Sequence, residues 1–221
     1  MKRVLEPEVM DSAEETAAYD AMDHAAVNSA FVSDLVAATP QLGGRAFRAL
    51  DLGTGTARIP ILLCQAAPSC RCTAVDLAAT MLRVGVRNLR SAGLEQRIDL
   101  LMAGAGTLPF RDGAFTVVMS NSLIHHLPSP ASAFREMRRV VAPGGVVFVR
   151  DLVRPESEAV LTGLVERYAG GETDTQRALF DASLRAALTL EEVRALVTDL
   201  ELASLRLTPT SDRHWTLVAT R

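Results

Sequence analysis

The sequence predicts an α/β fold built on a seven-stranded, mostly parallel sheet whose last strand runs antiparallel to its neighbours. Short apolar segments alternate with longer helical segments through the first two thirds of the chain, as in repeated strand–helix–strand units. A glycine-rich loop follows the first apolar segment, where open α/β sheets bind ligands. Two apolar segments near the C-terminus are joined by a short polar link, which predicts an antiparallel pair at one sheet edge.

The first segment predicted to be regular is a helix over residues 12–38. Ser12 and Glu15 fit a capping box, and small and apolar residues recur at helical spacing after them. Pro40 and Gly43-Gly44 end this helix. The alternating segments that follow predict strands over 47–50, 71–75, 98–102, 114–119 and 146–149 and helices over 57–67, 78–92 and 131–141, with a turn at Pro143-Gly144-Gly145.

The pattern changes after the fifth strand. Three helical stretches, over 156–169, 173–186 and 189–199, follow without a strand between them, and Thr189 to Glu192 form a favourable helix start. Strands over 203–207 and 215–219 end the chain. We therefore expect one domain with four parts: an N-terminal helical lid (1–42), a ligand-binding core (43–152), a helical insertion (153–200) and a C-terminal strand pair (201–221).

Composition and charge fit a globular protein and exclude several classes. Of the 221 residues, 48% are hydrophobic and 22% are charged, close to the average of folded domains. A net charge of −3 provides no basic surface for nucleic acid or an anionic membrane. The chain starts with charged residues, and no apolar run approaches a membrane span. We expect a cytoplasmic protein, a monomer or homodimer, that binds neither nucleic acid nor membranes.

The three cysteines are predicted to be reduced thiols, because their number is odd and secretory features are lacking. Cys70 and Cys72 alternate within a predicted strand and so point to one face. Without a second pair nearby, this spacing favours core packing over a metal site.

The strongest functional signal is Leu50-Asp51-Leu52-Gly53-Thr54-Gly55, between the first strand and the helix after it. The two glycines allow a tight turn and a close approach of the backbone to a ligand. A dinucleotide loop would have a third glycine where Arg58 stands, and Asp51 would repel a pyrophosphate. These features argue against an NAD-dependent oxidoreductase. They favour a ligand with positive charge, such as the sulfonium and amino groups of S-adenosylmethionine.

A second acidic residue, Asp76, ends the second predicted strand. A carboxylate at this position can accept hydrogen bonds from both ribose hydroxyls of a nucleoside. Leu77 and Met81 follow and could cover an adenine face. Core packing is the alternative for both, and it is the favoured one for Met81.

With these motifs, residues 45–152 resemble the class I S-adenosylmethionine-dependent methyltransferases, in the branch that includes ubiquinone and menaquinone C-methyltransferases. Leu108-Pro109-Phe110, the segment 122–127 and the segment 142–145 contribute to the resemblance. It implies a Rossmann-like fold and methyl transfer to a small-molecule acceptor. It also implies that Asp51 and Gly53 lie near the methionine amino group, Asp76 on the ribose and residues 103–108 around the adenine. The other expected cofactor contacts are Thr54, Gly55, Leu77, Met81, Gly104, Ala105, Asn121 and Tyr19.

Gly104 departs from the family's pattern, which has an aspartate there to contact the adenine amino group. Backbone carbonyls or the Thr107 hydroxyl could replace that contact, or the affinity is lower. One hydrogen bond is worth about 1 kcal/mol, too little to abolish binding. A cofactor-binding module without catalysis is therefore the alternative function.

The catalytic candidates lie at the carboxyl edge of the predicted sheet. His125 and His126 follow the fourth strand, and an imidazole titrates near neutral pH and can take a proton from an O–H or N–H acceptor. Packing of the loop is the alternative for both, and the resemblance favours His126, whose counterpart faces the cleft. Asp151 ends the fifth strand beside Arg154, for which a salt bridge at a helix start is the alternative. No acidic cluster marks this edge, so we expect no metal.

Two further regions, the N-terminal helix and the start of the last strand, are considered as parts of the functional site. Tyr19, Asp23 and Asn28 could lie over the cofactor, because N-terminal helices act as lids in the resembling family. Trp215, at the start of the last strand, is expected to belong to the core.

Overall fold

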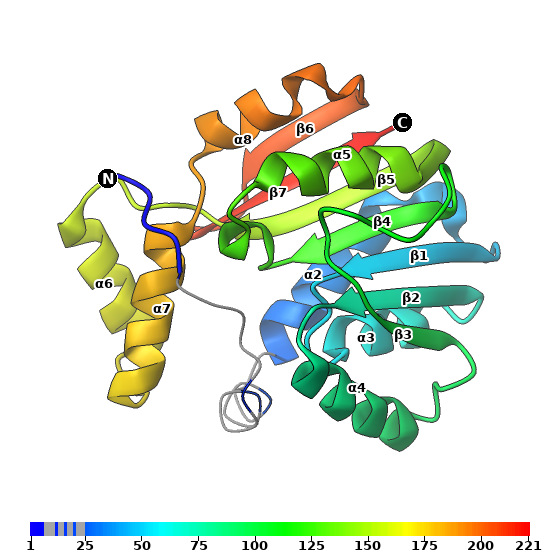
Figure 1. Ribbon diagram of the computed structural model, residues 1–221, viewed down its shortest axis with the longest axis horizontal. Helices are drawn as coiled ribbons and strands as arrows, with labels where there is room; N and C mark the ends of the chain where they lie inside the picture. Colours follow the sequence, from blue (N-terminus) through cyan, green and yellow to red (C-terminus); the bar gives the residue numbers. More distant parts are fainter. Residues whose placement is uncertain (7–11, 13–15, 17–19, 21–24) are drawn as a thin grey trace.

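The computed structural model describes residues 1–6, 12, 16, 20 and 25–221 (Figure 1). Seven strands form one sheet in the order β3-β2-β1-β4-β5-β7-β6. Their bounds are Phe47–Leu52 (β1), Cys70–Asp76 (β2), Ile98–Met102 (β3), Phe115–Asn121 (β4), Val141–Leu152 (β5), Ala203–Pro209 (β6) and His214–Thr220 (β7). β7 runs antiparallel to β5 and β6, and the other neighbouring strands pair in parallel. The predicted α/β fold with its antiparallel last strand is confirmed.

Helices cover both faces of this sheet (Figure 1). α2 (Ala25–Ala38), α3 (Arg58–Ala66) and α4 (Ala79–Ala92) lie over one face, and α5 (Pro130–Val140) and α8 (Leu190–Val197) lie over the other. Strands covered on both sides are buried on both sides, which explains the runs of consecutive buried residues in β1 and β4. Phe31 and Phe148 belong to the first core, and Phe134 and Trp215 to the second. Trp215 therefore lies in the core, as the sequence predicted.

The helical insertion stands beyond the carboxyl end of β5. α6 (Glu158–Ala169) and α7 (Asp174–Ala186) share a small core of their own, and the first residues of the chain lie beside α7 (Figure 1). The amide of Val4 donates to the carbonyl of Arg185 at 3.1 Å, and Nε of Arg3 donates to the carbonyl of Ala186 at 2.6 Å. The N-terminal segment and the end of α7 thus lie side by side near the carboxyl end of β5.

The predicted turn at Pro143-Gly144-Gly145 lies within a strand instead. β5 runs without interruption from Val141 to Leu152, although its register against β4 shifts between the pairs made by Phe115 and Val117. The amide of Gly144 donates to the carbonyl of Arg221, and the carbonyl of Gly145 accepts from the amide of Arg221. Gly144 has a φ of +74°, which glycine adopts without strain. Backbone pairing with the C-terminus therefore continues the strand through a sequence typical of turns.

The helix boundaries predicted after residue 38 agree with the structure to within two residues. Of the helix predicted over 12–38, α2 covers residues 25–38, Thr16 and Asp20 are also helical, and Ser12 lies in a bend. The remaining residues, including Glu15 of the proposed capping box, lie outside the described residues. α8 begins at the predicted helix start, where Thr189 and Glu192 form a capping box, but it ends at Val197, and a 3₁₀ turn over Thr198–Leu200 follows. Cys64, Cys70 and Cys72 are buried free thiols, as expected. No helix in the described ranges is both long and apolar enough to cross a membrane.

Candidate functional site

The glycine-rich loop turns back on itself directly after β1. Gly53 has a φ of +70°, and its amide and that of Thr54 both donate to the carbonyl of Val75 at 2.9 and 3.0 Å. A Cβ at Gly53 would lie 2.8 Å from Cδ1 of Leu123, closer than real Cβ contacts. Glycine is therefore required here for two reasons, the backbone conformation and the approach of the loop after β4.

A cavity of about 590 Å³ opens beside this loop, a volume typical of small-molecule sites. Four of the predicted cofactor contacts line it, namely Asp51, Gly53, Thr54 and Asn121, and α2 contributes the predicted lid residue Asn28. Within the described part of the chain, Oδ1 of Asn121 is buried without a hydrogen-bond partner. The cavity therefore holds an acceptor atom that a bound ligand can satisfy.

Asp51 is the most unusual group of this cavity. Its side chain is buried, and burial raises the pKa of its carboxyl from 3.8 to about 7. The hydroxyl of Thr54 opposes this increase, and the charge of Asp76 adds to it. Neither of these groups is cationic. Among the described residues, no cationic side chain contributes to this pKa shift, so a positively charged ligand would stabilise the ionised carboxylate.

Asp76 lies at the end of β2 beside the glycine-rich loop and is not among the residues that line the cavity. Its carboxylate accepts from the amides of Gly55 at 2.8 Å and Ala78 at 2.9 Å, which fixes it at the end of β2. Beside it, Leu77 is 54% exposed, and a Cβ at Gly104 would lie 3.5 Å from Leu77. These residues form a partly apolar surface at the carboxyl edge of the sheet.

Two of the predicted adenine contacts have buried side chains. Met81 is buried on α4, and Ala105 belongs to the core on the α5 side. The burial of Met81, in the first turn of α4, agrees with the core packing that the sequence favours for it.

The histidine pair lies in a 3₁₀ helix, η2 (Ile124–His126), directly after β4. His125 is buried, and its Nδ1 lies 2.5 Å from Oδ1 of Asp151 at the end of β5. Oδ2 of Asp151 accepts from the amide of Ile124 at 2.5 Å. Burial lowers the pKa of His125, but the attraction of Asp151 outweighs it and raises that pKa above the ordinary value of 6.5. Asp151 therefore orients His125 and the η2 backbone.

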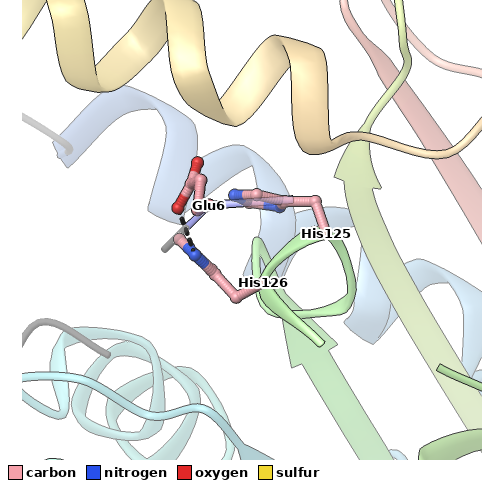
Figure 2. A group of neighbouring side chains, drawn as sticks. All are labelled: Glu6, His125 and His126. Atoms are coloured by element: carbon pink, nitrogen blue, oxygen red, sulfur yellow. Dashed lines mark ion pairs between the residues drawn. The ribbon is translucent and has the colours of Figure 1, made fainter. Parts of the chain in front are cut away.

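His126 is the more accessible of the two, and it faces the first residues of the chain. Its Nδ1 lies 2.6 Å from Oε2 of Glu6, as Figure 2 shows. Arg3 fixes the same loop, because its Nη2 donates to the carbonyls of His125 at 3.0 Å and Leu127 at 3.2 Å. Glu6 and Arg3 were not predicted as part of the site, since no local signal in the sequence connects them with η2. Metal ligands were not expected here, whereas the structure brings Glu6, His125 and His126 together.

The remaining candidates have structural partners or cannot be placed. Nη2 of Arg154 donates to Glu192 at 2.6 Å, which is the salt bridge at a helix start that the sequence allowed. Tyr19 and Asp23 lie outside the described residues. Asp20, which was not predicted, pairs with Arg58 at 3.0 Å and lines the cavity.

Comparisons with known proteins agree with this geometry. Residues 50–149 match the family model of a methyltransferase domain. The demethylmenaquinone methyltransferase of Thermus thermophilus is 38% identical over 54% of this chain and 53% of its own length. The malonyl-[acyl-carrier protein] O-methyltransferase of Geobacter sulfurreducens is 32% identical over 80% of this chain and 66% of its own length.

The fold extends the likeness beyond the matched segment. A Methanococcus maripaludis structure assigned as an S-adenosylmethionine-dependent methyltransferase superposes with a TM-score of 0.73, covering 99% of this chain and 97% of that protein at 15% identity. The chain spans about half the length of the demethylmenaquinone relatives it matches. Sequence and fold agree, and the chain belongs to the class I S-adenosylmethionine-dependent methyltransferases.

Proposed function

We propose that this protein transfers the methyl group of S-adenosylmethionine to a small-molecule acceptor. The observation that carries the proposal is the buried Asp51 carboxylate, which faces a cavity and has its pKa raised to about 7 by burial. An isolated buried carboxylate is costly, and a cationic ligand removes that cost. The amino group of S-adenosylmethionine supplies such a cation.

The residues present fit this cofactor. Asp51 pairs with the amino group, and Oδ1 of Asn121 accepts a hydrogen bond that the described residues do not provide. Asp76 has both oxygens on backbone amides, so it is held in place to accept from the ribose hydroxyls with its remaining lone pairs. When bound, the cofactor supplies an electrophilic methyl group on a sulfonium ion.

The parts outside the strand–helix core are proposed to bind the acceptor. Residues 1–42 act as a lid and residues 153–200 as an insertion that closes the acceptor side, while 43–152 hold the cofactor and 201–221 complete the sheet. In support, the first six residues, α7 and η2 meet at the carboxyl edge of the sheet. Closing this edge excludes water, which favours a reaction that discharges a cation.

His126 is proposed as the base that accepts the acceptor's proton. Glu6 lies against its Nδ1, which places the ring proton there and leaves the lone pair on Nε2 free. His125 and Asp151 act as positioning residues, because they are buried and hold η2 through the Ile124 amide. The protein's contribution is then orientation, proton acceptance and the exclusion of water.

Binding and turnover are tested separately. Calorimetry should show one S-adenosylmethionine or S-adenosylhomocysteine per chain and no NAD. Turnover is then followed by mass spectrometry with an acceptor panel of quinols, phenols, carboxylic acids and amines. The panel starts with demethylmenaquinone and malonyl thioesters, because the two relatives are named for such acceptors. NAD binding without S-adenosylmethionine binding would refute the proposal, and cofactor binding without turnover on any acceptor would favour a non-catalytic binding module.

A further inference from the structure

The cluster formed by Glu6, His125 and His126 is a set of metal-ligating side chains outside the cofactor cavity. One potential ligand atom from each residue lies within 4.8 Å of those of the other two. Figure 2 shows the carboxylate of Glu6 above the His126 ring and beside the His125 ring, which points toward it. The cluster joins the N-terminal segment to η2, at the carboxyl edge of β4.

The orientation of His125 is that of a prepared metal ligand. Its Nδ1 is engaged by the buried carboxylate of Asp151 at 2.5 Å, so the lone pair that remains is on Nε2. A carboxylate on the far nitrogen is the usual arrangement behind a metal-bound histidine, because it fixes the tautomer and makes the ring more basic. The same carboxylate accepts from the amides of Ile124 and Leu152, so it cannot rotate away.

Glu6 completes the donor set. Its Oε2 lies 2.6 Å from Nδ1 of His126, and its Oε1 is buried without a hydrogen-bond partner in the described part of the chain. Two imidazoles and one carboxylate are the ligands of many catalytic zinc sites, which leave a fourth position for water or substrate. Bonds of 2.0–2.2 Å would separate the ligand atoms by about 3.3 Å, between the 2.6 Å contact and the 4.8 Å limit of the cluster.

We propose that Glu6, Nε2 of His125 and Nδ1 of His126 bind one divalent transition-metal ion of the zinc class, with Asp151 as the outer partner of His125. The site ties the N-terminal segment to the loop after β4. A neutral imidazole bound to metal through Nδ1 carries its proton on Nε2 and cannot act as a base. Resting on the proposed function, the site therefore predicts that zinc inhibits methyl transfer.

The test measures metal binding directly, so its result does not depend on whether the protein transfers methyl groups. Zinc affinity of the full chain, without a polyhistidine tag, is determined by competition with a chromophoric chelator. Cobalt(II) binding is followed by its visible absorption. We expect one ion per chain, with Glu6→Gln and His126→Asn each weakening zinc at least tenfold, and Asp151→Asn weakening it by roughly 10–100-fold.

Two matched substitutions serve as controls. Glu191→Gln removes an exposed carboxylate, and His214→Asn removes a histidine outside the cluster, so both should leave zinc affinity unchanged. Circular dichroism confirms folding, and Glu6 and His126 are chosen because neither is as deeply buried as His125. The proposal is overturned if the wild type binds no zinc or if Glu6→Gln and His126→Asn bind it as tightly as the wild type. A thiolate charge-transfer band in the cobalt spectrum would likewise overturn it, by assigning the metal to the cysteines.

Discussion

Burial of Asp51 has two opposing effects. It strengthens the attraction of the carboxylate for a bound cation, and it disfavours the ionised form of the carboxyl in the free protein. We expect Asp51→Asn to weaken S-adenosylhomocysteine binding by roughly 10–100-fold, since a hydrogen bond to a charged group is worth about 1.5–3 kcal/mol. In the wild type, affinity should rise as the pH increases through about 7, where the free carboxyl becomes ionised. Calorimetry at a series of pH values checks both expectations.

The control is Asp99→Asn, which makes the same change on an exposed residue of β3. It should leave both the affinity and its pH dependence as in the wild type. Equal affinity in Asp51→Asn, or a pH profile that survives the substitution, would show that Asp51 does not pair with the amino group.

His126 is tested on an acceptor whose attacking atom carries a proton. His126→Ala should lower turnover by about 10²–10⁴-fold, the usual contribution of a positioned base, and leave cofactor affinity nearly unchanged. Glu6→Gln should lower turnover less, because it changes only the partner of the imidazole. Steady-state kinetics and calorimetry on the same preparations provide the readouts. An unchanged rate in His126→Ala would remove this residue from the mechanism.

Sequence reasoning was most informative for residues whose role follows from local context. Asp51, Gly53 and Asn121 were predicted from their places at strand ends, and the structure brings them to one cavity. Glu6 and Arg3 were missed, since their contacts with η2 cross more than half of the chain and carry no periodic signal. The burial of the Met81 and Ala105 side chains was not predictable in the same way, because spacing along the chain does not reveal how deeply a side chain is packed.

At the scale of elements, α2 brings cavity residues to the site and is held against the sheet by aromatic packing. The Phe31 ring meets that of Phe148 edge to face, with centroids 5.1 Å apart, and both rings are buried. Phe31→Ala should lower the free energy of unfolding by about 3–5 kcal/mol, as for other large-to-small core changes. Val36→Ala on the same helix, where the side chain is 43% exposed, should change it by about 0.5 kcal/mol or less. Denaturant unfolding compares the two, and similar losses would show that α2 is not anchored through Phe31.

The elements themselves were predictable where the pattern is long and local. The apolar strand of β4 and the helix start at Thr189 both appear as predicted. Strand ends were less predictable, because they depend on the partner strand. Pro143-Gly144-Gly145 is the clearest case, since the C-terminal Arg221 continues the pairing through a turn-like sequence.

At the scale of the whole molecule, the shifted pKa values of Asp51 and His214 change the pH dependence of stability in opposite directions. The folded chain raises the pKa of Asp51 to about 7, so folding takes up a proton above pH 3.8 and stability falls as pH rises toward 7. Burial lowers the pKa of His214 to about 4, so folding releases a proton below pH 6.5 and stability rises with pH from 4 to 6.5. The carboxyl groups with lowered pKa values titrate mainly below this range.

The free protein should therefore show nearly constant stability between about pH 5 and 6.5, and the two substitutions should separate the opposing contributions. Asp51→Asn should make stability rise with pH in this range, and His214→Gln should make it fall, each by at most about 1.4 kcal/mol per pH unit for one proton. Above pH 6.5 the wild type should lose stability, because the pKa of His125 is raised by Asp151 and its contribution disappears as that imidazole deprotonates. Thermal and denaturant unfolding across the range measure all three slopes. If the free energy of unfolding changed with pH equally in the two variants, the pKa of Asp51 would not be raised and that of His214 would not be lowered in the folded chain.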